Sequence, residues 1–177
     1  MDKRVNKKIK KLDRIDTDEY FLKMASVVAE RSTCRRHNIG AVAVRDKHIL
    51  ATGYNGAPAG LKDCLELGCL RDELGIPSGE RHEICRAVHA EQNVIIQAAL
   101  YGTSIEGATI YCTHTPCLIC AKMLVNARIK RFVSFGQYNV SAYDAFLNLK
   151  GFAGMFEDAG IKLDIKERPS SQVSYLD

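Results

Sequence analysis

The stretch PCLIC (residues 116–120) stands between a short β-rich run at 108–113 and a helical pattern at 117–127. Proline is favoured where a helix begins, because the first amide groups of a helix have no intrahelical partner. Cys117 and Cys120 are three residues apart, so both sulfur atoms lie on one face of the first helical turn. The positive dipole end of that turn favours thiolates. The stretch therefore predicts a strand-turn-helix unit that presents two metal-binding sulfurs.

The stretch HAE (residues 89–91) supplies the groups that the two cysteines lack, near the start of a second helical pattern. One neutral imidazole and two thiolates make a three-ligand zinc site, and the open fourth position is typical of catalytic zinc. Such zinc activates water, and a carboxylate two residues after the histidine can accept and redeliver the proton. We therefore predict a catalytic carboxylate and three zinc ligands, which are Glu91, His89, Cys117 and Cys120.

The two motifs together are more informative than either alone. An isolated C-x-x-C also suits redox pairs and structural zinc, and a lone histidine is usually a core residue. H-x-E combined with P-C-x-x-C is typical of zinc-dependent nucleobase deaminases. The combination predicts hydrolytic deamination, in which water attacks an amine-bearing ring carbon while Glu91 protonates the ring nitrogen and then the departing amine.

The periodicity of the remaining chain predicts an α/β fold. Residues 55–86, interrupted repeatedly by glycine and proline, are predicted to form a long functional loop. A hairpin followed by alternating helices and strands predicts a mixed sheet covered by helices on both faces. The predicted helices are 17–31, 87–100, 117–127 and 141–159, and the predicted strands are 39–44, 49–54, 108–113, 130–135 and 162–166.

Length and hydropathy place the chain among globular proteins of one domain. Its 177 residues suffice for one packed domain and are too few for two ordinary ones. We expect a single domain at residues 16–177 after a basic N-terminal extension at residues 1–15. No apolar run approaches the roughly 18 residues of a membrane span, and none follows the basic N-terminus as in a secretory signal. We therefore expect a cytoplasmic protein with no membrane partner.

The net charge of +4 is concentrated at the N-terminus. Residues 1–14 carry seven basic and two acidic side chains, whereas the remainder carries 18 basic and 19 acidic side chains. Proteins that bind nucleic acid usually show positive charge on the folded surface, so a nucleic-acid partner is not expected for this nearly neutral body. The extension is expected to be a solvated tail, and contact with nucleic acid is the alternative.

Beyond the two motifs, the sequence resembles the deoxycytidylate (dCMP) deaminases of the cytidine deaminase superfamily over residues 20–163. The most specific part of the resemblance is TGYNGAPAG (residues 52–60) with the cysteine-bearing loop that follows. The other matching segments are STCRR (32–36), IGA (39–41), CRAV (85–88), HAEQN (89–93), TPC (115–117) and Tyr138. The resemblance implies a three-layer α/β/α sandwich on a mixed five-stranded sheet, a zinc cofactor, and hydrolysis of dCMP to dUMP and ammonia.

The resemblance also implies contacts with the nucleotide. Asn55 would contact the sugar, and Arg36, with Arg35 as a weaker candidate, would meet the phosphate through charge-assisted hydrogen bonds. Tyr138 would lie near the nucleotide. A solvated turn is the alternative for the arginines, and simple packing is the alternative for Tyr138. The resemblance further implies a homo-oligomer, often a hexamer, and some members of the family carry an allosteric site for dCTP and dTTP.

A second group of soft ligands lies in the long loop. Seven cysteines without a secretory signal argue against a disulfide framework. Some relatives carry a structural zinc in this region, and four ligands here would complete a tetrahedral shell that holds the loop. The candidate ligands of this second zinc are Cys64, Cys69, His82 and Cys85, with Cys34 as an alternate. Free or packed thiols are the alternative, and Cys112, within a predicted strand, is expected to be a core residue.

Three other functions share part of this signature. A tRNA adenosine deaminase and a free cytidine deaminase use the same zinc motifs. A non-catalytic zinc-stabilised binding module would need only the zinc ligands and no catalytic carboxylate. The nearly neutral body argues against an RNA substrate, and the loop with its GYNG segment favours a nucleotide. Glu91 argues against the binding module, because a structural zinc site has no use for an unligated carboxylate beside it.

Overall fold

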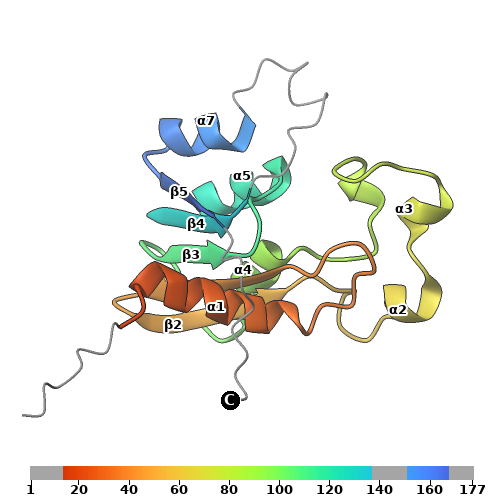
Figure 1. Ribbon diagram of the computed structural model, residues 1–177, viewed down its shortest axis with the longest axis horizontal. Helices are drawn as coiled ribbons and strands as arrows, with labels where there is room; N and C mark the ends of the chain where they lie inside the picture. The colour runs from red at the N-terminus through yellow and green to blue at the C-terminus, as the bar shows by residue number, and fades with distance from the viewer. Residues whose placement is uncertain (1–13, 137–150, 168–177) are drawn as a thin grey trace, which may run out of the picture.

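The computed structural model describes residues 14–136 and 151–167. In these ranges a five-stranded sheet with strand order β2-β1-β3-β4-β5 forms the middle layer (Figure 1). β1 pairs antiparallel with β2 and β3, whereas β3, β4 and β5 run parallel. The strands are β1 (Gly40–Arg45), β2 (His48–Tyr54), β3 (Thr109–Cys112), β4 (Arg131–Phe135) and β5 (Lys162–Lys166). The predicted mixed five-stranded sheet is confirmed.

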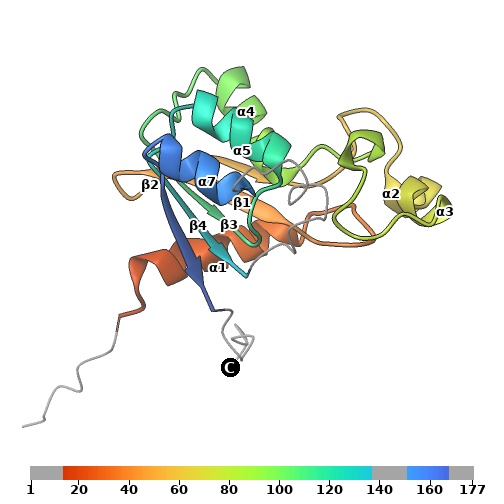
Figure 2. The ribbon, with the colours of Figure 1, turned by 90° about the horizontal axis from the view of Figure 1, so that it is seen from above.

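Helices cover both faces of the sheet, as Figure 2 shows from above. Alternate side chains of β1 point to opposite faces, so Val42 packs with Phe21 of α1 while Ala43 packs with Val94 of α4. The helix on the first face is α1 (Thr17–Ala29), and those on the second are α4 (Ala90–Leu100), α5 (Leu118–Asn126) and α7 (Gly151–Asp158). The predicted three-layer sandwich is therefore present.

Two glycines let helices approach the sheet closely. A Cβ atom at Gly40 would lie 2.1 Å from the carbonyl oxygen of Ala25, and one at Gly53 would lie 2.4 Å from that of Ala90. Neither position has room for a larger residue. The contact at Gly53 presses the first turn of α4 against β2, and Asn93 of α4 adds a hydrogen bond from Nδ2 to the carbonyl oxygen of Tyr54 at 2.7 Å. The start of α4 is thereby fixed relative to the sheet.

The helix predicted at 87–100 begins three residues later in the structure. Val88 forms an isolated bridge with Gly56, and His89 is the N-cap residue of α4 with extended backbone angles. The apolar pattern at 87–89 therefore belongs to an extended segment. The predicted strand at 162–166 is confirmed as the edge strand β5. The helix predicted at 141–159 is described only over α7, and its earlier part, like most of the N-terminal extension, lies outside the described residues.

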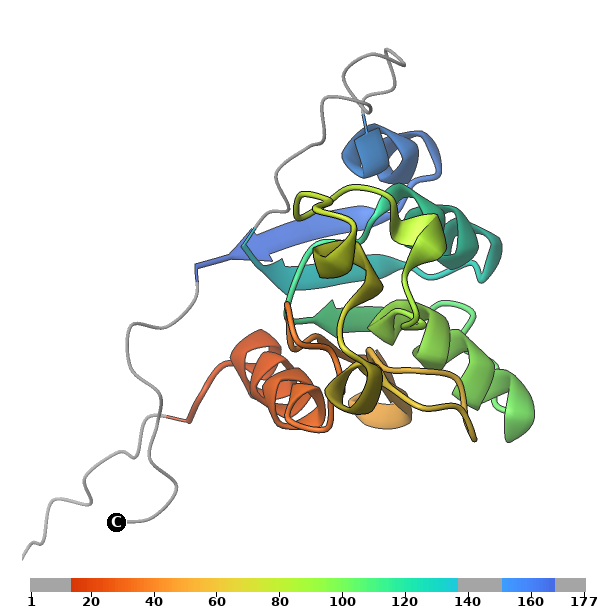
Figure 3. The same ribbon diagram turned by 90° about the vertical axis from the view of Figure 1, so that its right-hand side faces the viewer.

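The predicted loop at 55–86 forms an excursion with three short helical turns, α2 (Cys64–Leu67), α3 (Leu70–Glu73) and η1 (His82–Ile84). Figure 1 shows α2 and α3 projecting to one side of the sheet, and Figure 3 views the molecule from that side. The excursion therefore supplies a wall beside the sheet. Within the described ranges, no helix is both long and apolar enough to cross a membrane.

Arg131 of β4 joins the first helix to the sheet. It donates from Nη1 and Nη2 to the two carboxylate oxygens of Asp18, both at 2.7 Å, and from Nε to Asp164 of β5 at 2.6 Å. Tyr111 of β3 also donates its hydroxyl to Asp18 at 3.0 Å. The hydrogen bond from Arg131 lowers the pKa of Asp18 to about 2, against burial, which raises it. Asp18 thus links α1 directly to β3 and β4 and, through Arg131, to β5.

Asp18→Asn should lower the free energy of unfolding by about 2 kcal/mol at neutral pH. A carboxylate with a lowered native pKa stabilises the fold above its unfolded pKa of about 3.9, and this contribution disappears as the pH falls through the native value. The deficit of the variant should therefore shrink between about pH 5 and about pH 2, as urea unfolding measured across that range would show.

Glu19→Gln is the matched control on the same helix, because Glu19 forms an exposed pair with Lys23 at 2.7 Å. Its effect should stay below about 0.5 kcal/mol. An Asp18 deficit as small as the control, or one independent of pH, would show that the Arg131 network contributes no stability.

Candidate active site

The N-termini of α4 and α5 meet at the ends of the strands and bring three metal-ligand side chains together. His89 is the N-cap residue of α4, Cys117 is that of α5, and Cys120 lies in the first turn of α5. The Nδ1 atom of His89 is 3.4 Å from the Sγ atom of each cysteine. Among the described residues, these three form the only group of at least three histidine, cysteine or acidic side chains whose ligand atoms lie within 4.8 Å of one another.

The spacing of these atoms fits zinc. Bonds of about 2.3 Å to sulfur and about 2.1 Å to nitrogen in a tetrahedral site place the two kinds of ligand about 3.6 Å apart. The observed separation of 3.4 Å is close to that value without any rearrangement of the chain. A backbone hydrogen bond from His89 to Oε1 of Gln92, at 2.9 Å, holds the start of α4 in place. The predicted ligand set is thus assembled by backbone geometry.

Without a bound metal, the pKa values of the two thiols are shifted in opposite directions. A hydrogen bond from Cys120 lowers the pKa of Cys117 to about 4, against burial, and the same pairing together with burial raises the pKa of Cys120. Burial lowers the pKa of His89, but its hydrogen bond and attraction to Cys117 outweigh burial and raise it. A divalent cation would favour two thiolates and a neutral imidazole.

Glu91 lies beside the ligand group in the first turn of α4, with 4% of its surface exposed. Burial, and then the negative charge of Cys117, raise its pKa to about 7. No arginine or lysine forms an ion pair with it among the described residues. A buried carboxylate in this position can take up and release protons near neutral pH, which is what general acid–base catalysis requires.

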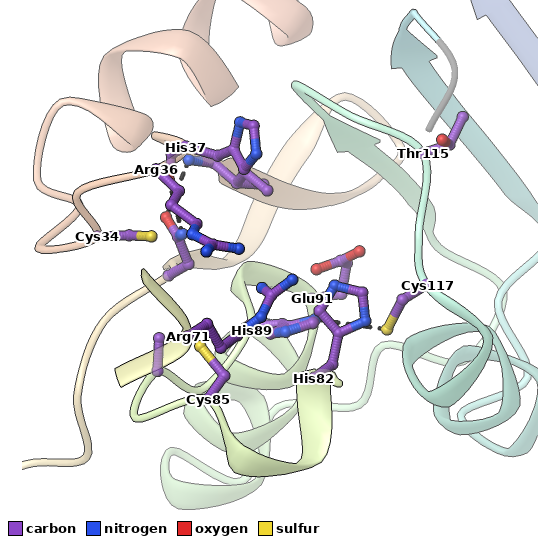
Figure 4. A pocket seen from close by; sticks show the side chains of 13 residues that line it. Cys34, Arg36, His37, Arg71, His82, Cys85, His89, Glu91, Thr115 and Cys117 are labelled. Atoms are coloured by element: carbon purple, nitrogen blue, oxygen red, sulfur yellow. Dashed lines mark hydrogen bonds between the residues drawn. The ribbon is translucent and has the colours of Figure 1, made fainter. Parts of the chain in front are cut away.

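A pocket opens over this group, with walls from the excursion and from the segment after α1 (Figure 4). Of the described residues, Glu91 is the only acidic one that lines it, whereas two arginines and three histidines do. Of the predicted substrate contacts, Asn55 and Arg36 line the pocket, and Tyr138 lies outside the described residues. The other lining residues are Cys34, His37, Ile39, Arg71, His82, Cys85, Ala87, His89, Thr115 and Cys117.

The Asn55 side chain is already engaged in holding the pocket wall. Its Oδ1 accepts from Ser32 Oγ at 2.6 Å and from the amide of Ile39 at 2.9 Å, while its Nδ2 donates to the carbonyl oxygen of His37 at 2.8 Å. An amide nitrogen carries two hydrogens, so one donor remains. Asn55 therefore shapes the wall and keeps one N–H for a bound molecule.

The guanidinium of Arg36 is already occupied by hydrogen bonds to the excursion. Its Nε donates to Asp72 at 2.6 Å, its Nη2 to the carbonyl oxygen of Ile76 at 2.7 Å, and its Nη1 to that of Pro77 at 3.3 Å. Every nitrogen of the guanidinium thus has a partner in the excursion. The side chain fastens α3 and the following turn to the segment after α1.

Sequence reasoning missed His37, Arg71 and Thr115 in the pocket. Arg71 follows the Cys69-Leu70 pair in an irregular segment, and neither periodicity nor motif spacing distinguishes it from other loop arginines. Its burial, with 5% of its surface exposed, is the signal that singles it out, and that signal exists only in the folded chain.

The candidate ligands of the second zinc divide between two places. Burial raises the pKa of Cys64, and the charges of Cys34, Cys69 and Cys85 raise it further, but no three of these sulfur atoms lie within 4.8 Å of one another. The ring of His82 instead stands edge-on to the ring of His89, with centroids 5.2 Å apart. The structure thus places His82 beside the first ligand group, and among the described residues it does not bring a second set of metal ligands together.

Comparison with known proteins adds independent support for the site. Residues 15–135 match the family model described as the cytidine and deoxycytidylate deaminase zinc-binding region. ComE operon protein 2 of Bacillus subtilis is 36% identical over 153 residues, which is 86% of this chain and 72% of that protein. Deoxycytidylate deaminase of Schizosaccharomyces pombe is 37% identical over 130 residues, or 73% of this chain, and the match spans only 40% of the yeast protein.

Among solved structures, dCMP deaminase from the cyanophage S-TIM5, in complex with dCMP and dUMP, superimposes with a TM-score of 0.67. It is 28% identical, and the match covers 87% of this chain and 99% of that protein. The match therefore extends well beyond the two motifs.

Cys120→Ala should remove one equivalent of zinc per chain, because a three-ligand site cannot lose a thiolate and keep its metal. Cys112→Ala is the matched control, since Cys112 is equally buried on β3 but lies outside the ligand group. Elemental analysis of the purified proteins, with circular dichroism to verify folding, measures the difference. Equal zinc content in the two folded variants would exclude Cys120 as a ligand.

Proposed function

Because the chain belongs to the cytidine and deoxycytidylate deaminase family, we propose that it hydrolyses dCMP to dUMP and ammonia. The observation that carries this proposal is the buried Glu91 carboxylate beside a His-Cys-Cys ligand group. A structural metal site has no use for an unpaired carboxylate at that place, whereas hydrolytic deamination needs one to move protons.

Glu91 carries the protons of the proposed reaction. Zinc bound by His89, Cys117 and Cys120 would supply a water that ionises near neutral pH. Glu91 accepts the proton that the attacking water loses and delivers it to the ring nitrogen beside the amine-bearing carbon. A second proton passes through Glu91 to the amino group, the carbon–nitrogen bond breaks, and ammonia leaves while a carbonyl group remains.

The chemistry of the pocket supports a nucleotide as the substrate. Arginine and histidine side chains outnumber the single carboxylate, which suits a molecule with a phosphate group. The remaining N–H of Asn55 suits a sugar hydroxyl, and Arg36 contributes positive charge to the wall that its hydrogen bonds hold. The cyanophage protein, which binds dCMP and dUMP, is similar over nearly its whole length. The role of Tyr138 stays a prediction.

We also propose a structural zinc held by Cys34, Cys64, Cys69 and Cys85. Four thiolates complete the closed tetrahedral shell of a structural site, and a metal there would fasten the excursion to the segment after α1. Support comes from the electrostatic effect of Cys34, Cys69 and Cys85 on Cys64 and from the position of His82 beside His89, and metal binding would have to draw the four sulfur atoms closer together. The expected zinc content is therefore two per chain.

We further propose that the protein assembles as a homo-oligomer, with a hexamer as the expected form. Large apolar side chains are exposed at the end of α4 and on α5, including Leu100 with 71% and Tyr101 with 80% of their surfaces accessible. Such surface is commonly covered in an assembly. Regulation by dCTP and dTTP and a cytoplasmic location stay predictions.

Glu91→Gln should reduce kcat for dCMP by a factor of about 10² to 10⁴ while zinc content stays unchanged. The amide keeps the shape of the side chain but cannot accept the proton of water. An ammonia-release assay over dCMP, dCTP, cytidine, adenosine-containing RNA and buffer alone measures turnover and substrate choice together. Glu106→Gln, at an exposed surface pair with Arg128, is the control.

Turnover of Glu91→Gln close to that of the control would contradict the proposed role of Glu91. Preference of the wild type for RNA or for the free nucleoside would replace dCMP by one of the alternative substrates. Absence of ammonia release from every substrate, in zinc-loaded protein, would favour a binding module.

Cys64→Ser should leave one zinc per chain and lower the unfolding temperature, because the excursion would lose the metal that holds it to the segment after α1. His82→Ala is the informative control, since it should keep both zinc ions if the four cysteines form the shell. One zinc in the wild type would exclude the second site, and loss of one zinc in His82→Ala would return His82 to the ligand set.

A further inference from the structure

Among the described residues, Arg71 is a buried arginine without a counter-ion. It lies in α3 with 5% of its surface exposed, its Nη2 donates to the carbonyl oxygen of Pro77 at 3.0 Å, and its Nε has no hydrogen-bond partner. Among the described residues, no carboxylate lies within ion-pair distance of it. A guanidinium stays charged even when buried, so an unpaired one is costly unless an anion neutralises it.

The pocket over Glu91 is where that anion would lie. Arg71 lines this pocket, and Figure 4 shows its side chain directed into it. Burial lowers the pKa of both His37 and His82, and the charge of Arg71 lowers each further, which places the guanidinium near both rings. Because a lowered pKa keeps both rings neutral near pH 7, Arg71 is the side chain that supplies positive charge to this part of the pocket.

The two arginines of the pocket differ in how many of their guanidinium nitrogens already donate hydrogen bonds to the protein. Arg36 uses Nε, Nη1 and Nη2 in hydrogen bonds to the excursion, and its charge is offset by Asp72. Among the described residues, Arg71 donates a hydrogen bond only from Nη2. Both donate to the carbonyl oxygen of Pro77, so the network around Arg36 also fixes the turn against which Arg71 rests.

We propose that Arg71 binds the 5′-phosphate of the substrate and thereby sets the preference for a nucleoside monophosphate over a nucleoside. The inference rests on the proposed function and names the residue that gives it its substrate class. A guanidinium presents its N–H groups in a planar fork that matches two phosphate oxygens. The phosphate supplies the negative charge that the buried side chain lacks, and Glu91 remains with the base.

The test compares kcat/KM for dCMP and for deoxycytidine in the wild type, Arg71→Gln and Arg71→Lys. Arg71→Gln should lower kcat/KM for dCMP at least tenfold, mainly through KM, and change that for deoxycytidine less than threefold. Arg71→Lys keeps a charge but loses the fork, so its ratio of the two values should fall between those of the wild type and Arg71→Gln. Arg128→Gln, at an exposed arginine, should leave the ratio unchanged.

The ratio of the two substrates separates binding of phosphate from damage to the fold. An equal loss with both substrates, or an unchanged ratio, would overturn the role of Arg71 while leaving dCMP deamination intact. If Arg71→Gln does not fold, the ratio in Arg71→Lys decides, and a wild-type ratio there would overturn the proposal. A wild type that does not prefer dCMP would instead overturn the proposed function, and the phosphate role with it.

Discussion

The convergence of two helix N-termini on three ligand atoms is the constraint on which the rest of the structure depends. The ligand atoms of His89, Cys117 and Cys120 come from segments that are 28 to 31 residues apart, yet they stand 3.4 Å apart. The register of β1 between β2 and β3 brings those segments together, since α4 packs on β2 and α5 follows β3. Gly53 sets the depth to which α4 can settle on the sheet.

The excursion turns this metal-ligand group into a pocket with a chemical preference. Arg36 and Asp72 fasten α3 to the segment after α1, and Asn55 fastens the same segment to the end of β2. These contacts leave Arg71 buried over the site, with no carboxylate partner among the described residues. The sheet and helices thus provide the reacting groups, and the excursion provides the charge that recognises a nucleotide.

The fold could be predicted largely because its signals are local. The strand-turn-helix at PCLIC and the helical start at HAE depend on spacing within a few residues, and the edge strand at 162–166 on its composition. The helix boundary at Ala90 could not be placed, because the bridge between Val88 and Gly56 is a contact between segments distant in sequence. Local patterns do not contain such contacts.

The pocket wall was harder to predict for the same physical reason. Arg36 and Arg71 look alike in the sequence, and only the fold shows that the first has partners for all its nitrogens while the second is buried with few. Likewise, the position of His82 against the ring of His89 follows from the path of the excursion. Residue type identifies candidates, and burial and partners decide among them.

Anomalous diffraction at the zinc absorption edge, from crystals of the full chain, tests the central claim most directly. The account predicts a zinc peak bonded to Nδ1 of His89 and to the sulfurs of Cys117 and Cys120, with its fourth position free of protein ligands and facing Glu91. A peak with Glu91 or His82 as the fourth ligand would make the site closed and structural, and would contradict the proposed chemistry. Absence of a peak at these three residues in zinc-loaded protein would contradict the metal site itself.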